Sequence, residues 1–220
     1  MKVCTDACVL GAWADINGAE RILDIGSGTG LLALMVAQRN PLAKIDGVEL
    51  DRSAYLQAVE NVNESLFKAQ ISVLNSSIQQ FSPTYKYDCI VTNPPFFQSD
   101  LLSPNDLKNA AHHAVTLSFD DLLHALDRLL TENGSFHILL PVEEALLFFK
   151  KATVLNWNLS RKLILHHNKL KNPFRQLMTF KRKDLIENQT IEENLYIYNA
   201  GSGSYTSEFK DLLKDFYLIF

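Results

Sequence analysis

Residues 21–30 read R-I-L-D-I-G-S-G-T-G, and the apolar run Leu31–Arg39 follows directly. The apolar residues of Arg21–Ile25 predict a short buried strand, and three closely spaced glycines predict a tight turn from that strand into a helix. Glycine lets a backbone approach a ligand closely, and the first turn of a helix has N–H groups without intrahelical partners. This stretch therefore predicts an α/β fold with a ligand-binding loop after its first strand.

The glycines of this loop are Gly26, Gly28 and Gly30. Their spacing differs from the G-x-G-x-x-G dinucleotide pattern, because the third glycine comes one residue early and Leu31 follows it. With Asp24 two residues before the first glycine, the loop instead resembles the cofactor loop of the S-adenosylmethionine-dependent methyltransferases. A carboxylate can hold an ammonium directly or through water, which suits the amino-acid end of this cofactor better than a pyrophosphate. The alternative is a glycine-rich turn without a chemical role.

Strands and helices are predicted to alternate up to residue 155. The later strands are expected at 44–50, 71–74, 89–91 and 136–140, the helices at 51–68, 119–130 and 142–155, and two strands without a helix between them at 159–166 and 176–181. This alternation predicts an α/β fold with a doubly wound, mostly parallel, seven-stranded sheet and an antiparallel edge pair. No linker or repeat divides the chain, so a single domain over residues 1–220 is expected.

Helix ends carry local signals of their own. Ser118 and Asp121 predict a capping box at the start of helix 119–130, and Asn133-Gly134 is expected to end that helix. Near the N-terminus, a mostly apolar stretch at 7–15 predicts another helix, with the Thr or Asp just before it as its cap.

An acidic residue ends the second predicted strand. Glu49 lies about 19 residues after the last glycine, the distance at which such folds place a ribose-binding acid. A carboxylate there can accept hydrogen bonds from both ribose hydroxyls. A surface acid beside Asp51, favoured by the dipole of the following helix, is the alternative.

The fourth predicted strand runs into Asn93-Pro94-Pro95-Phe96. Two prolines have fixed φ and no N–H, so the strand must stop and the turn is stiff. The Asn93 side-chain oxygen and the Pro94 carbonyl are both acceptors for one planar NH2 group, and Phe96 offers a face for stacking. Two such acceptors would help to localise the lone pair of an amine for attack on an electrophile. An ordinary strand-ending turn is the alternative.

Composition limits the possible classes of protein. With 47% apolar residues the chain can bury a core, and it contains no apolar stretch long enough for a membrane span and no secretory signal pattern. Cys4, Cys8 and Cys89 are odd in number, so reduced thiols in a cytoplasmic protein are expected rather than a disulfide framework or a zinc site. His112-His113 and His166-His167 are adjacent pairs whose side chains point apart, so no metal is expected.

The net charge of −4 argues weakly against a nucleic-acid partner, but charge is unevenly placed. Residues 161–183 hold eight Lys or Arg and no acid, whereas residues 184–220 hold seven acids. This basic edge segment is interpreted either as a solvated surface or as a phosphate-facing patch.

The chain resembles the bacterial tRNA1(Val) (adenine-37-N6)-methyltransferase family over nearly its whole length. The resemblance rests on the glycine loop, the ribose acid and Asn-Pro-Pro-Phe, which keep the order and spacing of the N6-adenine and related amino methyltransferases. The narrower signatures are M-K-V-C-T-D-A-C-V-L-G-A-W-A at 1–14, A-H-H-A-V-T-L-S-F at 111–119, L-L-P at 139–141, N-P-F-R-Q-L at 172–177, Y-T-S-E-F at 205–209 and D-F-Y-L at 215–218.

The resemblance implies a class I, Rossmann-like methyltransferase fold and roles for individual residues. Segment 1–15 would cover the cofactor, with Thr5 and Asp6 over its methionine end rather than acting only as caps. The implied cofactor-binding residues are Thr5, Asp6, Asp24, Gly26, Gly28, Gly30, Glu49, Ser77 and Asn93. The implied catalytic residues are Asn93, Pro94, Pro95 and Phe96. The implied RNA-binding residues are Arg161, Lys162, Lys169, Lys171 and Arg175.

Three features depart from the family pattern. Family members usually have a short β-rich segment before the signature with which this sequence begins, so this sequence is expected to start later than its relatives. Cys4 and Ala7 replace glycines that are common in the signature. Ser77 stands where an Asp usually accepts a hydrogen bond from the cofactor's adenine amine, and a neutral hydroxyl should make a weaker bond there.

The function expected from this resemblance is methyl transfer from S-adenosylmethionine to N6 of an adenine next to the anticodon of a tRNA. The protein is expected to be cytoplasmic and monomeric, with tRNA as its partner and without a metal. Asn-Pro-Pro-aromatic also suits a protein glutamine amide or a guanine N2 of ribosomal RNA, and the acid-free basic segment favours RNA. A catalytically inactive RNA-binding protein of the same fold is the alternative from another class.

Overall fold

The computed structural model describes residues 4–94, 117–182 and 190–219. Pro95, Phe96 and the pair His112-His113 lie outside these ranges, so what the sequence predicts for them stays a prediction. The strands are β1 (Arg21–Ile25), β2 (Lys44–Glu49), β3 (Ile71–Asn75), β4 (Tyr87–Thr92), β5 (Leu130–Leu140), β6 (Trp157–His166), β7 (Pro173–Arg182) and β8 (Ile191–Tyr196). The helices are α1 (Thr5–Trp13), α2 (Leu31–Arg39), α3 (Arg52–Glu64), α5 (Phe119–Leu129), α6 (Val142–Val154) and α7 (Ser207–Leu213).

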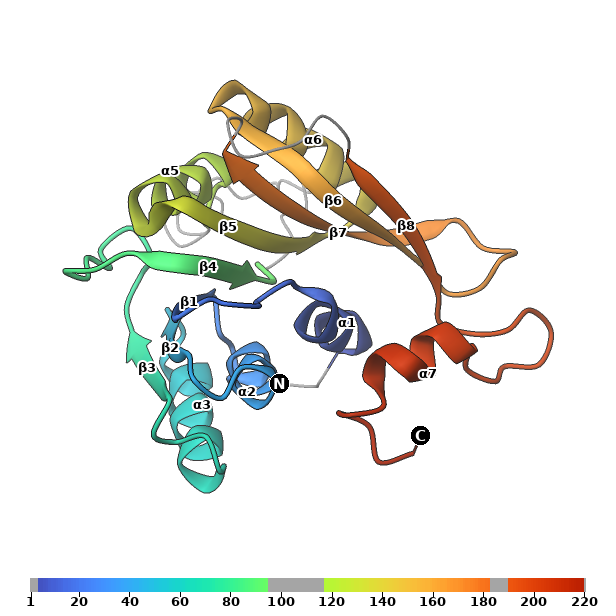
Figure 1. Ribbon diagram of the computed structural model, residues 1–220, viewed down its shortest axis with the longest axis horizontal. Coiled ribbons are helices and arrows are strands. Elements are labelled where there is room, and N and C mark those ends of the chain that lie inside the picture. The colour runs from blue at the N-terminus through green and yellow to red at the C-terminus, as the bar shows by residue number, and fades with distance from the viewer. Residues whose placement is uncertain (1–3, 95–116, 183–189, 220) are drawn as a thin grey trace, which may run out of the picture.

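The described strands form one eight-stranded sheet in the order β3-β2-β1-β4-β5-β7-β6-β8. Strands β1 to β5 pair in parallel, β7 is antiparallel to both β5 and β6, and β8 is parallel to β6. The chain builds outward from β1 to β3 and then returns to place β4 on the other side of β1 (Figure 1). Such a reversal of strand order opens a crevice at the carboxyl ends of the strands, where open α/β sheets bind ligands.

Helices cover both faces of the sheet and give it two apolar cores. One core joins the sheet to α1, α2 and α7, with one residue of α3, and the other joins it to α5 and α6. Figure 1 shows α5 and α6 above the sheet and the other helices below it. The alternation that predicts a doubly wound α/β sheet is therefore confirmed, and all described strands except β7 run the same way.

Three details differ from the sequence-based expectations. The sheet has an eighth strand, because β8 pairs outside β6, and the predicted antiparallel pair therefore lies inside the sheet rather than at its edge. Helix α5 has the predicted capping box at Ser118, but it ends at Leu129, and Asn133-Gly134 lies within β5 at a shift in register. Helix α1 begins at Thr5 with Cys4 at its N-cap, so neither Thr5 nor Asp6 is the cap.

Among the described residues, no helix combines the length and the apolar character that crossing a membrane requires.

Candidate active site

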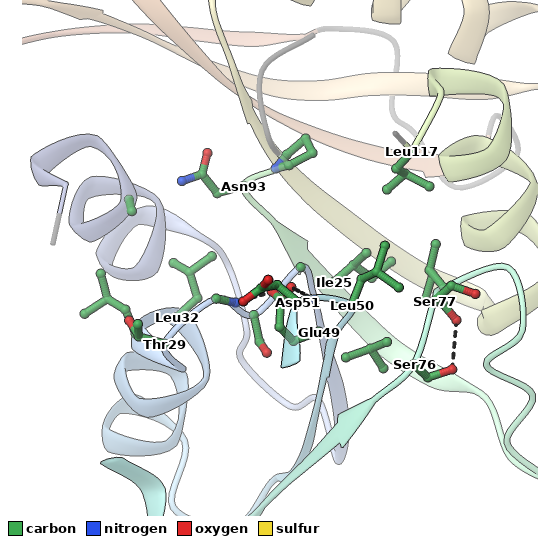
Figure 2. Close-up of a pocket in the computed structure, with 18 of the residues that line it drawn as sticks. Ile25, Thr29, Leu32, Glu49, Leu50, Asp51, Ser76, Ser77, Asn93 and Leu117 are labelled. Atoms are coloured by element: carbon green, nitrogen blue, oxygen red, sulfur yellow. Dashed lines mark hydrogen bonds between the residues drawn. The ribbon is translucent and has the colours of Figure 1, made fainter. Parts of the chain in front are cut away.

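A cavity of about 660 Å³ lies at the carboxyl ends of the central strands. The loop after β1, the ends of β2 and β3, and the corner after β4 all contribute to its lining, as does the first part of α1. Figure 2 shows Asn93 on one side of this cavity and Glu49, Ser76 and Ser77 on the other. The cavity therefore joins the glycine loop and the Asn-Pro corner, which are separated by more than sixty residues in the sequence.

The glycine loop has the backbone conformation that its sequence predicts. Gly26, Gly28 and Gly30 have φ of +71°, +56° and +83°, values that other residues adopt only with strain. Gly26 and Gly28 line the cavity, whereas Gly30 is the N-cap of α2 and packs toward Ala58 of α3. Two of the three glycines thus face the ligand space, and the third sets the direction of the following helix.

Asp24 lies beneath the loop rather than in the cavity wall. Its carboxylate is fully buried, and Oδ2 accepts a hydrogen bond of 3.1 Å from the Ala33 N–H in the first turn of α2. Burial raises the pKa of Asp24 to about 7; the Ala33 bond opposes this rise and the nearby Glu49 charge adds to it. Oδ1 has no hydrogen-bond partner in the described structure. An unpaired buried carboxylate oxygen at this position fits the ammonium that the sequence predicts for it, reached through water or a small shift.

Glu49 is held by the backbone on two sides. Its Oε2 accepts from the Gly28 N–H at 2.7 Å, and its Oε1 accepts from the Asp51 N–H at 2.8 Å. Each carboxylate oxygen retains a further acceptor position, so both could accept from a pair of ribose hydroxyls. Asp51 instead caps α3 by accepting from the Ala54 N–H at 2.7 Å. The structure therefore places the two neighbouring acids in different roles, with Glu49 lining the cavity as a fixed acceptor.

The far wall of the cavity is formed after β3. Ser76 and Ser77 both line it, and the Ser77 hydroxyl accepts from the Gln80 N–H at 3.3 Å. Leu50 and Ile78 add apolar surface to the same cavity. Apolar side chains beside a serine hydroxyl are the type of lining that can hold a planar heteroaromatic ring.

The Asn-Pro corner presents an unpaired acceptor. Asn93 Oδ1 is buried and has no hydrogen-bond partner in the described structure, and both Asn93 and Pro94 line the cavity. The preceding Thr92 is fully buried, and its hydroxyl donates to the Ile25 carbonyl at 2.9 Å. This bond ties the end of β4 to the end of β1, immediately before the glycine loop. The corner is thus fixed relative to that loop, and a donor that enters the cavity would satisfy Asn93.

The N-terminal helix contributes to the cavity through two residues for which the sequence predicts no cofactor-binding role. Cys4 and Ala7 line it, whereas Thr5 and Asp6 are not among the lining residues. The Asp6 carboxylate points instead to Arg175, with Oδ2 at 2.9 Å from Nε. Cys4 and Ala7 are the positions where the sequence departs from the glycines of the family pattern, and that departure was the available signal.

The basic edge segment is paired with acids that come from elsewhere in the chain. Three of its five predicted RNA-binding cations make ion pairs, which are Arg161–Glu193 at 2.6 Å, Lys162–Glu192 at 2.7 Å and Arg175–Asp6 at 2.9 Å. Lys169 lies 5.8 Å from the centre of the Tyr196 ring, and neither Lys169 nor Lys171 makes an ion pair in the described structure. Of these five cations, the two without an ion pair in the described structure, Lys169 and Lys171, therefore both lie in the turn between β6 and β7.

Comparison with known proteins shows which proteins the chain is similar to. The family model for the methyltransferase small domain matches residues 12–140. A tRNA1(Val) (adenine(37)-N6)-methyltransferase of Dyadobacter fermentans is 55% identical over 220 residues, which are all of this chain and 92% of that protein.

Solved structures show the same fold at low sequence identity. A predicted O-methyltransferase from Agrobacterium tumefaciens superposes with a TM-score of 0.72 at 17% identity, covering 95% of each chain. An O-methyltransferase of a trans-AT PKS multienzyme from Brevibacillus brevis, in complex with S-adenosyl-L-homocysteine, has a TM-score of 0.57 at 11% identity, covering 83% of this chain and 73% of that one. Because the Dyadobacter fermentans protein is 55% identical over all of this chain, and because the family model matches more than half of the chain, the chain belongs to the tRNA1(Val) (adenine(37)-N6)-methyltransferase family.

Proposed function

We propose that this chain transfers a methyl group from S-adenosylmethionine to N6 of an adenine next to the anticodon of a tRNA, namely A37 of tRNA1(Val). Membership of the family supports the reaction and the cofactor. The observation that carries the proposal is the buried, unpaired Asn93 Oδ1 beside Pro94 in the wall of the cavity. A buried acceptor without a partner is costly in an isolated protein, and it becomes useful when a substrate donor completes it.

Residues of both walls fit the cofactor. Backbone N–H groups of the glycine loop would lie along its methionine end, and the Asp24 carboxylate would balance the ammonium. Glu49 would accept from the ribose hydroxyls with its remaining acceptor positions, and the Ser77 hydroxyl would accept from the adenine amine. When bound, the cofactor supplies an electrophilic methyl group on a sulfonium.

The chain's own contribution to the chemistry is to position and polarise the target amine. Asn93 Oδ1 and the Pro94 carbonyl would each accept one hydrogen of the exocyclic NH2. These bonds would orient the nitrogen toward the methyl group and draw its lone pair out of conjugation with the ring. A strong general base is unnecessary, because the nitrogen becomes acidic only as the new bond forms. Phe96, which lies beyond the described residues, remains the predicted stacking surface for the base.

The target base has to leave its stack to reach this cavity. Enzymes that modify bases extrude the nucleotide into a pocket, and a base in an anticodon loop is already outside a regular duplex. Lys169 and Lys171 lie in the β6–β7 turn, at the same sheet edge as the cavity, because β6 runs parallel to β5. We propose that this turn contacts the RNA backbone, and that the chain acts in the cytoplasm as a monomeric, single methyltransferase domain over residues 1–220.

Substitution of Asn93 by Ala tests this proposal. Asn93→Ala is expected to abolish methyl transfer to tRNA1(Val) while leaving S-adenosylmethionine binding, measured by calorimetry, nearly normal. Asn63→Ala removes an exposed amide from α3 and serves as the control that should keep full turnover. Comparable turnover in the Asn93 variant would refute the role assigned to it.

A second experiment tests the substrate. Bulk tRNA, ribosomes and release factors are incubated separately with the protein and labelled cofactor, and nucleoside analysis then identifies the product. Methylated adenosine in tRNA is expected. Methyl groups found instead on a protein glutamine or on guanine N2 of ribosomal RNA would contradict the proposed substrate and leave the methyltransferase chemistry in place.

A further inference from the structure

Arg175 and Asp6 form an ion pair that links the start of β7 to the first turn of α1. The Arg175 Nε lies 2.9 Å from Asp6 Oδ2, and the two side chains are only 23% and 12% exposed. Asp6 also accepts from the Ala7 N–H at 3.0 Å, and Ala7 is one of the residues that line the cavity. The ion pair is therefore one step removed from the cofactor cavity, on the outer side of the helix turn that closes it.

Arg175 is held in one orientation by its neighbours. Its Nη1 donates to the Phe174 carbonyl at 3.0 Å, and its guanidinium carbon lies 5.5 Å from the centre of the Phe174 ring. The Phe174 ring is itself stacked on His167, with ring centres 4.0 Å apart. A guanidinium in such a setting is a rigid anchor for a carboxylate, since its planar fork loses little freedom on binding. Lys171, on the same turn, has no ion pair in the described structure and is the better candidate for an RNA phosphate.

The other end of α1 is anchored separately. Trp13 Nε1 donates to Glu193 at 3.1 Å, and Arg161 lies over the Trp13 ring at 4.5 Å. Buried His137 of β5 contacts the Asp15 carbonyl at 3.0 Å, just beyond the helix. The helix is thus fixed to the sheet at its C-terminal end without the help of Asp6. Loosening the ion pair at its first turn should therefore move the cavity wall without releasing the whole helix.

We infer that Arg175 is a positioning residue for the cofactor cavity, acting through Asp6 on the first turn of α1, rather than a phosphate-binding residue. The inference rests on the cofactor role proposed for this cavity. It assigns a function to an arginine that sequence analysis grouped with the RNA-binding cations, and it gives Asp6 a role on the outer side of the wall.

The test compares cofactor binding with RNA binding in matched variants. Arg175→Gln and Asp6→Asn are each expected to weaken S-adenosylmethionine binding, measured by calorimetry, about three- to tenfold, the loss typical of a charge-assisted hydrogen bond that is partly screened. The double variant should be no weaker than either single variant, because both changes remove the same contact. Arg175→Lys, which retains the charge, should recover part of the affinity.

Two controls separate this contact from general charge loss. Lys171→Gln removes a cation from the same turn and should leave cofactor affinity unchanged while raising the KM for tRNA. Lys151→Gln breaks the 2.7 Å ion pair with Asp120, between α5 and α6, and should leave cofactor affinity unchanged as well. The midpoint of thermal unfolding, measured for every variant, identifies any variant that fails to fold. The double variant Arg175→Gln/Asp6→Asn removes both charges of the pair, so it leaves neither charge buried without its partner.

The outcomes are distinct. Normal cofactor affinity in Arg175→Gln, together with a raised KM for tRNA like that of Lys171→Gln, would overturn the inference and restore a phosphate-binding role. Independent, multiplicative losses in the double variant would also overturn it. Absence of cofactor binding in the unmodified protein would instead refute the proposed function itself.

Discussion

Replacement of Asp24 by Asn should change the stability of the cofactor-free protein in a pH-dependent way that favours the variant as the pH rises. The Asp24 carboxyl is fully buried, receives one hydrogen bond from the Ala33 N–H, and has a second oxygen without a partner in the described structure. Burial is the main reason that its pKa is raised from 3.8 to about 7. A carboxyl whose pKa is higher in the folded chain than in the unfolded chain lowers the stability of the fold at every pH at which the unfolded chain has released its proton.

The sign and size of the effect follow from these two pKa values. Below pH 3.8 the carboxyl is protonated in both states and does not change the free energy of unfolding. Between pH 3.8 and about 7 the unfolded chain releases the proton while the folded chain keeps it, so stability falls as the pH rises. Above pH 7 the full cost is present, about 4 kcal/mol at 1.36 kcal/mol for each pH unit. The part lost between about pH 5 and pH 7 is about 3 kcal/mol.

Urea unfolding of the two proteins at about pH 5 and about pH 8 measures this difference directly. An Asn amide leaves a buried NH2 without an acceptor, which costs about 1–3 kcal/mol at either pH. The change between the two pH values is independent of that cost, so the variant should gain about 3 kcal/mol on the unmodified protein between them. Asp211→Asn, which removes an exposed carboxylate from α7, is the control and should gain little. An equal difference at both pH values would refute a protonated Asp24 in the folded chain.

The same substitution should weaken the cofactor complex. The cofactor's ammonium near Asp24 would stabilise the charged carboxylate and offset the cost of burying that charge. Removal of the carboxylate should therefore weaken cofactor binding. Calorimetry at about pH 8 is expected to show a loss of about tenfold or more for Asp24→Asn, the range for a hydrogen bond to a charged group. Unchanged affinity would show that this carboxylate supports the loop only.

Three further predictions concern single side chains. Glu49→Gln should weaken cofactor binding about tenfold to a hundredfold, because the new NH2 group must face one of the two backbone N–H groups, of Gly28 or Asp51, that donate to Glu49. Calorimetry measures the affinity, and an affinity equal to that of the unmodified protein would contradict the prediction. Ser77→Asp should strengthen binding several-fold, because a charged acceptor makes the stronger bond to an amine, and a weaker complex in the same assay would count against the placement of the adenine there. Burial lowers the pKa of His137 from 6.5 to about 4, so the free energy of unfolding should fall by about 3 kcal/mol as the pH falls from 6.5 toward 4. His137→Gln should reduce this fall in urea unfolding, and an unchanged dependence of stability on pH would contradict the assignment.

Local sequence signals predicted the part of the fold that forms the first half of the cavity. The bounds of β1 and α2 match the predictions at both ends, because an apolar run, a glycine turn and a second apolar run leave few alternatives. Ser118 forms the predicted capping box with Asp121, which also depends only on neighbours in the sequence. The spacing of Glu49 from the glycines likewise placed it at the end of β2, where it lines the cavity.

Long-range pairing explains what local signals missed. The segment Ile191–Tyr196 is polar and largely exposed, so nothing local marks it as a strand, and it exists as β8 because β6 offers it an edge. Asn133-Gly134 is a good helix-ending signal, yet parallel pairing of β5 with β4 takes in these residues at a register shift. Glu192 and Glu193 are two of the seven acids in residues 184–220, and only the pairing of β8 with β6 brings them to Lys162 and Arg161.

The two halves of the cavity differ in how their polar atoms are satisfied. In the cofactor half, Glu49 already receives two backbone hydrogen bonds, so its position is fixed before any ligand enters. In the acceptor half, Asn93 Oδ1 has no partner in the described structure, so the amine of a substrate could complete it. The bond from Thr92 to the Ile25 carbonyl joins these halves at the adjacent ends of β4 and β1. Because that link is buried, it should hold the two walls in a fixed relation as the target amine and the methyl group come together, so positioning should account for most of the rate enhancement.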